Sequence, residues 1–271
     1  MNRIAETYNQ DPQREWSRLV RDPYHTLEFR VTWHYLQKYL PPTGKVLDGG
    51  GGPGRYALEL CRAGYQVNLF DLSARLLEVA RDKFRMEPEI VQRRLLESVE
   101  GDIRDLSYYP DSHFDVVLCL GGPLTHISEK AGREQAFAEL VRVTRPGGII
   151  AVAVVRYLAV LRTIMEQFTD ELVIPSFQTL LDEGDTTGPT NTIWHFYRAA
   201  ELRQQAEAHG LITLEMAGCQ GLSTGMIAAT NALAQDQAKW QRWLDLVVDT
   251  ANDPALVDLA EHILYIGRKS G

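Results

Sequence analysis

The chain has 271 residues, a length that one large α/β domain with additions can absorb. A formal net charge of -8 and a pI near 5.4 predict a surface that repels phosphate backbones, which argues against nucleic acid as a partner. The 3 cysteines are too far apart for a disulfide framework or a zinc knuckle, so no metal site is expected. The sequence shows neither the apolar core of a signal peptide nor an apolar run of about eighteen residues. We therefore expect a cytoplasmic protein with no membrane contact.

From about residue 45, strand-length apolar runs alternate with helical periodicity, which predicts βαβ units. The expected strands are 45–49, 66–70, 98–100, 114–120, 148–155, 211–217 and 262–268. The expected helices are 55–62, one capped by Ser73, 88–96, 128–143, 198–209 and a helical pair over 226–260. The predicted fold class is therefore α/β, doubly wound, with a mostly parallel seven-stranded sheet and helices on both faces.

Two kinds of addition surround this sheet in the sequence. Residues 1–40 read as helical and rich in aromatic side chains, so we expect a helical N-terminal lid before a main domain over 41–271. Cap insertions are expected at about 158–195 and 220–258, where the alternation loosens. Within the first, residues 182–192 are rich in Gly, Thr and Pro and are expected to form a loop without a regular element.

The segment most informative about function is Asp48-Gly-Gly-Gly-Gly-Pro-Gly54, at the junction of the first strand and its helix. Glycines there let backbone N–H groups approach a ligand closely. The spacing of Gly50, Gly52 and Gly54 gives G-x-G-x-G, but the segment also satisfies the dinucleotide pattern G-x-G-x-x-G. Asp71, after the second strand, can accept hydrogen bonds from ribose hydroxyls in either case. These residues predict a nucleoside-containing cofactor, but they do not decide between the G-x-G-x-G pattern and the dinucleotide pattern.

The next segment favours one of them. Gly101-Asp-Ile-Arg-Asp-Leu106 follows the third strand, where an acid can bind an adenine amino group and an apolar neighbour can cover the ring. With D-x-G-x-G-x-G, Asp71, the F-D-V-V-L strand and the R-P-G-G turn at Arg145–Gly148, the chain resembles the class I, Rossmann-like S-adenosylmethionine-dependent methyltransferases of small-molecule type. The resemblance covers roughly residues 40–156 well and 195–270 weakly. Gly49 departs from the family, which usually has a larger apolar residue there.

The resemblance implies S-adenosylmethionine as cofactor and assigns the residues that would bind it. Asp48 with Gly50, Gly52 and Gly54 would hold the methionine part, and Asp71 the ribose. The remaining implied contacts are Leu72 and Ile103 on the adenine faces, Asp102 at its amino group, and the Leu120 and Gly121 backbone at the sulfonium end.

The acceptor side is predicted less specifically. His126, after the fourth strand, is a candidate general base because imidazole titrates near neutral pH, although it could also bond locally. Candidate contacts to a small-molecule acceptor are Tyr8, Trp16, Tyr24, Tyr157 and His195. Three alternatives remain open: a non-catalytic module that binds the cofactor, an NAD-dependent oxidoreductase, and methylation of protein or RNA.

Overall fold

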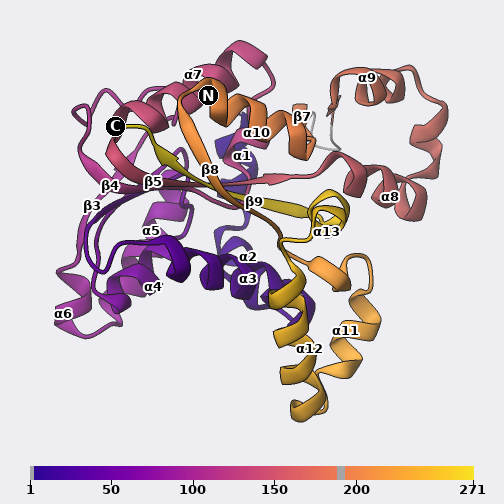
Figure 1. Cartoon of the computed structure of the whole chain (residues 1–271), viewed down its shortest axis with the longest axis horizontal. Helices are drawn as coiled ribbons and strands as arrows, with labels where there is room; N and C mark the ends of the chain where they lie inside the picture. The colour runs from indigo at the N-terminus through magenta and orange to yellow at the C-terminus, as the bar shows by residue number, and fades with distance from the viewer. Residues whose placement is uncertain (1–2, 188–192) are drawn as a thin grey trace.

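The computed structural model describes residues 3–187 and 193–271 and is built around one seven-stranded sheet (Figure 1). The order is β3-β2-β1-β4-β5-β9-β8, and all neighbours pair in parallel except β9, which is antiparallel to both β5 and β8. The strands are β1 Lys45–Gly49, β2 Gln66–Asp71, β3 Leu95–Glu100, β4 Phe114–Cys119, β5 Thr144–Val155, β8 Leu211–Gly218 and β9 His262–Lys269. The predicted doubly wound, mostly parallel sheet is confirmed.

Helices cover both faces of the sheet because successive strand residues point to opposite sides. Val46 and Val116 pack in one apolar cluster, and their neighbours Leu47 and Val117 pack in the other. The helices that pack in the first cluster are α3 Pro23–Tyr39, α4 Arg55–Ala63, α5 Ala74–Arg85 and α12 Gln237–Thr250. Those that pack in the second cluster are α7 Lys130–Val143, α10 Ala199–Ala208 and α13 Pro254–Leu259. Figure 1 shows the two groups of helices on either side of the strands.

The N-terminal segment is helical, as expected. It comprises α1 Arg3–Gln10, α2 Pro12–Ser17, the 3-10 turn η1 Arg18–Val20 and α3. The Asp22 side chain caps α3 by accepting a hydrogen bond from the His25 amide, and Pro23 occupies the first helical position. Leu27 and Val31 of α3 are fully buried, which ties this segment to the sheet.

The first cap segment contains α8 Tyr157–Gln167, the 3-10 turn η3 Thr169–Val173, α9 Pro175–Glu183 and the hairpin of β6 Asp185–Thr187 and β7 Ile193–His195. Figure 1 shows α8 and α9 beyond the end of the main sheet. The prediction of a loop without regular structure over 182–192 is wrong for 182–183, which end α9, and for 185–187, because Asp185 pairs with His195 in this hairpin. Residues 188–192 lie outside the described part of the chain.

Other predicted boundaries are also wrong. The helix expected over 88–96 shrinks to α6 Glu89–Gln92, and the third strand begins at Leu95 instead of 98. The strand expected over 148–155 begins at Thr144, so the segment expected as a turn before it lies within β5. The helical pair expected over 226–260 is three helices, α11 Ile227–Leu233, α12 and α13. Asp236 and Asp253 cap α12 and α13 and start a new helix at each position.

Short 3-10 turns complete the main connections, with η2 Pro123–His126 after β4 and η4 Gly221–Ser223 after β8. Among the described residues, no helix combines the length and apolar character that crossing a bilayer requires.

Candidate functional site

The glycine bend after β1 lies at the carboxyl ends of the central strands. The amides of Gly50 and Gly51 donate to the Phe70 carbonyl at 2.7 and 3.2 Å, which joins the bend to β2. Gly50, Gly52 and Gly54 all have positive φ, between 56° and 76°, a backbone region that glycine occupies without strain. A Cβ on Gly51 would lie 2.5 Å from the Asp48 carboxylate, so the backbone passes directly over this acid.

Asp48 is fully buried, and neither of its carboxylate oxygens has a hydrogen-bond partner in the part of the chain that the structure describes. Burial and the neighbouring charge of Asp71 raise the pKa of Asp48 to about 7, against a weaker opposing effect of the Ala57 amide. A buried carboxylate without a partner is unfavourable in a folded protein. Its position at the wall of a cavity fits a ligand that brings a positively charged hydrogen-bond donor.

Asp71 is buried but well supported. Its Oδ2 accepts from the Gly52 amide and its Oδ1 from the Ser73 amide, both at 2.8 Å. Burial raises the pKa of Asp71 to about 6 in spite of these two bonds. The side chain is therefore fixed in direction, and its remaining lone pairs are available to hydroxyl groups of a ligand.

Asp102 lies at the same cavity, in the loop after β3. Both of its oxygens accept from Arg104 Nε at 3.0 Å, and the Arg104 amide donates to Oδ1 at 2.9 Å. This local ion pair was not apparent from the sequence, because Arg104 is two positions away on a loop whose turn brings it back. Ile103, between them, is buried against Phe70 and Leu106 in the second apolar cluster.

One cavity of about 320 Å³ brings most of the predicted cofactor residues together. Every one of them lines it except Gly54, which begins α4 in a left-handed conformation. Of the predicted acceptor-side residues, Tyr8 and His126 line the cavity. The side chains of α1 cover one side of it, where Asn9 accepts from the Ser73 hydroxyl at 2.6 Å.

Four other predicted acceptor contacts do not line this cavity. Trp16 packs under the guanidinium of Arg55, whose central carbon is 4.0 Å from the ring centroid. Tyr24 donates to Glu261, and Tyr157 packs in the apolar cluster of the first cap segment.

The fourth of these residues, His195, has its ring nitrogens 2.6 Å from Asp185 and 2.8 Å from Glu201. Like the other three it is engaged in packing or local bonding, so we do not assign any of the four to the acceptor.

Arg18 and Glu15 are among the residues of the cavity wall that were not singled out from the sequence. Arg18 donates from Nε to Glu15 at 2.7 Å and from Nη1 to Glu28, which is buried behind the wall, at 2.8 Å. A Cβ built on Gly121 would lie 3.2 Å from Arg18 NH2, which places the guanidinium against the backbone after β4. A lone arginine and glutamates in a helical segment carry no pattern that could have revealed this contact.

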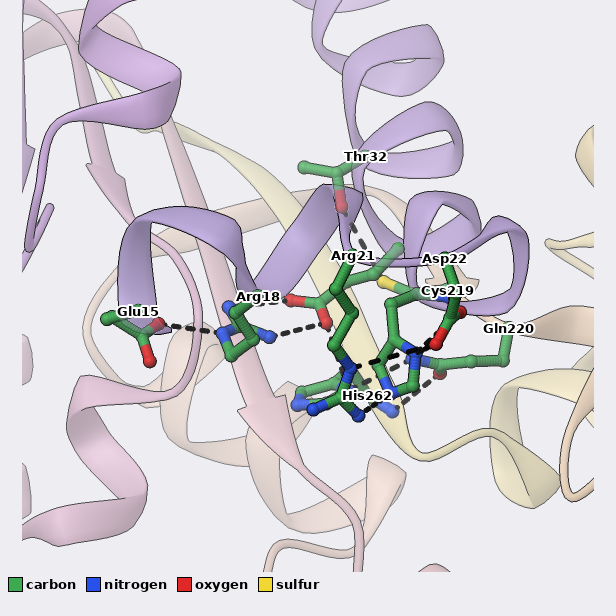
Figure 2. A network of polar contacts seen from close by, with 10 residues as sticks. Glu15, Arg18, Arg21, Asp22, Thr32, Cys219, Gln220 and His262 are labelled. Carbon is green, nitrogen blue, oxygen red and sulfur yellow. Dashed lines mark hydrogen bonds and ion pairs between the residues drawn. The ribbon is translucent and has the colours of Figure 1, made fainter. Parts of the chain in front are cut away.

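A polar network behind the wall holds Arg18 in place (Figure 2). Glu28 lies 3.5 Å from His262 at the start of β9, and His262 is 3.1 Å from the Gln220 amide. The charges of Arg18 and His262 lower the pKa of Glu28 and oppose its burial. The network therefore links the N-terminal helices to the ends of β8 and β9.

Comparison with known proteins agrees with this site. Residues 46–148 match the family model described as "Methyltransferase domain". A glycine/sarcosine N-methyltransferase of Aphanothece halophytica is 29% identical over 130 residues, which are 44% of this chain and 47% of that protein. The chain thus spans less than half of the length of this relative.

Solved structures resemble the whole fold. An S-adenosylmethionine-dependent methyltransferase from Methanosarcina mazei superposes with a TM-score of 0.61 at 18% identity, covering 87% of this chain and 97% of that one. The [4+2]-cyclase SpnF superposes with a TM-score of 0.55 at 22% identity, covering 89% and 80%. At these identities the likeness concerns the fold.

The matched segment carries the glycine bend, Asp71 and Asp102, so fold and site define one class. Residues 46–148 match a methyltransferase domain, and the sheet around them has the Rossmann-like class I fold of the solved S-adenosylmethionine-dependent methyltransferase from Methanosarcina mazei.

Proposed function

We propose that this chain transfers the methyl group of S-adenosylmethionine to a small-molecule acceptor. The observation that carries the proposal is the buried Asp48 carboxylate at the cavity wall, which has no hydrogen-bond partner among the described residues. The ammonium group of an amino-acid tail matches it in charge and supplies the missing donors. The proposal also accounts for the glycine bend, where added side chains would fill the space beside Asp48.

The residues around the cavity then divide into contacts for each part of the cofactor. The glycine bend and Asp48 would hold the methionine part, Asp71 the ribose, and Leu72 and Ile103 the adenine faces. Asp102 retains lone pairs beside Arg104 for the adenine amino group. The Leu120 and Gly121 backbone would lie at the sulfonium end. When bound, the cofactor supplies a methyl group that its positive sulfur already activates.

The chain's own contribution is alignment and exclusion of water. The side chains of α1, the glycine bend and the turn after β4 all line the cavity, where Tyr8 and His126 lie within hydrogen-bonding distance of each other. A cavity of about 320 Å³ favours a small acceptor over a macromolecule. The relative from Aphanothece halophytica is named for glycine and sarcosine, which are small acceptors of this kind. We also infer a cytoplasmic protein that does not act on nucleic acid, in line with its net charge of -8.

Isothermal titration with S-adenosylhomocysteine tests the proposal. We expect one site per chain, and Asp71→Ala should weaken binding by about tenfold or more, because a charged acceptor of hydrogen bonds is lost. Asp105→Ala is the matched control, since Asp105 is an exposed acid of the next loop and does not line the cavity.

Other results would point to the alternatives. Tight binding of NADH with none of S-adenosylhomocysteine would favour an oxidoreductase. Binding without methyl transfer to any acceptor would favour a non-catalytic module, and the cyclase SpnF illustrates that this fold also hosts other activities.

A further inference from the structure

A direct contact joins the N-terminal helix to the turn after β4 inside the cavity. Tyr8 Oη of α1 lies 2.7 Å from His126 Nε2 of η2. The Trp194 ring packs edge-on against the imidazole with centroids 4.3 Å apart. Both Tyr8 and His126 line the cavity, as do Leu120 and Gly121 after β4.

The protonation of the two groups gives this contact a direction. Burial lowers the pKa of His126 to about 4, so its imidazole is neutral near pH 7. Burial also raises the pKa of Tyr8 above its usual value, so the phenol keeps its proton. Of the two arrangements that a neutral imidazole allows, the phenol O–H donating to Nε2 uses the better acceptor. His126 Nε2 is then occupied, and the Tyr8 oxygen has only lone pairs left for a ligand.

The charges around this pair favour a nucleophile that becomes positive. Among the charged cavity residues that act on Tyr8, Glu15 and Asp71 are carboxylates and Arg18 is a guanidinium. Arg18, the cation on the acceptor side, is held by Glu15 and by the buried Glu28 behind it. The environment of Tyr8 thus provides more negative than positive charge.

This inference rests on the proposed function and names the acceptor class. We propose that Tyr8, positioned by His126, accepts a hydrogen bond from the reacting atom of the acceptor, and that this atom is a neutral amine nitrogen bearing N–H. The nitrogen lone pair forms the bond to the methyl carbon while the carbon–sulfur bond breaks, and the electron pair of that bond stays on sulfur. The ammonium product then releases its proton to solvent.

The amine fits better than a hydroxyl for two reasons. As the nitrogen becomes positive, its N–H becomes a stronger donor, so the bond to Tyr8 strengthens in the transition state. A hydroxyl acceptor would first have to lose its proton to a base, and His126 is neutral, weakly basic and already engaged. Tyr8 is thus the residue that contacts the acceptor, and His126, predicted from the sequence as a base, is a positioning residue.

Sinefungin provides a probe that does not require the acceptor to be known. In this analogue a carbon replaces the sulfur of S-adenosylmethionine and carries an amine in place of the methyl group, whereas S-adenosylhomocysteine has no N–H there. Titration calorimetry should show that Tyr8→Phe lowers sinefungin affinity by about fivefold to tenfold, as loss of one hydrogen bond implies, and leaves S-adenosylhomocysteine affinity unchanged. Tyr39→Phe is the control, because Tyr39 donates to Glu215 at 2.9 Å and does not line the cavity.

Two variants of His126 separate positioning from packing. His126→Gln keeps a hydrogen-bond acceptor for the Tyr8 phenol, so the ratio of sinefungin affinity to S-adenosylhomocysteine affinity should stay within about twofold of wild type. His126→Phe should lower this ratio as Tyr8→Phe does. If Tyr8→Phe changed the affinities for sinefungin and S-adenosylhomocysteine equally, or changed neither, this inference would be overturned while the proposed function would stand. Failure of wild-type protein to bind S-adenosylhomocysteine would overturn the proposed function and this inference with it.

Discussion

At the scale of single residues, the two buried acids of the cavity are held very differently. Asp71 accepts hydrogen bonds from two backbone amides, whereas neither Asp48 oxygen has a hydrogen-bond partner among the described residues and the Ala57 amide lowers its pKa only weakly. Both have a raised pKa, to about 6 for Asp71 and about 7 for Asp48, and burial is the largest cause for each. The Asp71 side chain is thus held in place before a ligand binds, whereas the Asp48 carboxylate would be stabilised most by a cationic ligand.

The raised pKa of Asp48 predicts how stability depends on pH without ligand. The folded chain keeps the Asp48 proton up to about pH 7, but the unfolded chain loses it near the ordinary aspartate pKa of 3.8. Stability should therefore fall as pH rises between these values, by about 1 kcal/mol per pH unit for this group.

Urea unfolding of wild type and Asp48→Asn at several pH values measures this contribution. The Asn variant should show a shallower decline by about that amount, because an amide does not titrate. Identical pH dependence in the two proteins would contradict the assigned pKa.

At the scale of elements, the network of Figure 2 explains how a short helical segment is fixed at the cavity. Arg18 in η1 bonds to Glu28 in α3, and Glu28 in turn faces His262 of β9. Glu28 is only 4% exposed, so its charge depends on these partners.

We predict that Arg18→Met destabilises the fold by about 3 kcal/mol or more, because Glu28 would be left buried without its main partner. The double variant Arg18→Met with Glu28→Met should recover part of this loss. Arg21→Met should change stability little, since Arg21 is half-exposed and lies 3.8 Å from Asp22 at the surface. Chemical denaturation of the four proteins gives the comparison, and an Arg18→Met loss no larger than that of Arg21→Met would refute it.

The strands that the sequence predicts best are the central ones. Phe114–Cys119 and Lys45–Gly49 are covered on both faces, so their apolar runs are nearly continuous and their bounds are correct within one residue. β3 is an edge strand whose residues are partly or fully exposed, so its first residues lack this pattern, and Leu95 and Leu96 were predicted as part of the preceding helix.

The residues of the site also differ in how well the sequence predicts them. Asp48, Asp71 and Asp102 are predictable because each lies at, or just after, the end of a strand that the sequence marks. The Arg18 and Tyr8 contacts depend on where helices 1–40 pack against the sheet, and local patterns carry no information on that packing. Trp16 and Tyr157 illustrate the same limit, since aromatic character alone did not distinguish a cavity wall from a packed interior.

At the scale of the whole molecule, the cavity lies where the strand order reverses between β1 and β4, the usual ligand position in open α/β sheets. The N-terminal helices close it from one side, and Trp194 of the first cap segment packs against His126 from another. The additions to the sheet thus converge on the acceptor side. The acceptor class should therefore depend on these segments more than on the matched domain.

Label transfer from S-adenosylmethionine carrying a trideuterated methyl group measures directly whether this chain methylates a small molecule. The protein is incubated with this compound and an extract of the source cells, which is then separated into small-molecule and macromolecular fractions for mass spectrometry. We predict one trideuteromethyl group on a compound of the small-molecule fraction, and no transfer by Asp71→Ala at the same cofactor concentration. Label found only in the macromolecular fraction, or remaining on S-adenosylmethionine, would contradict the account.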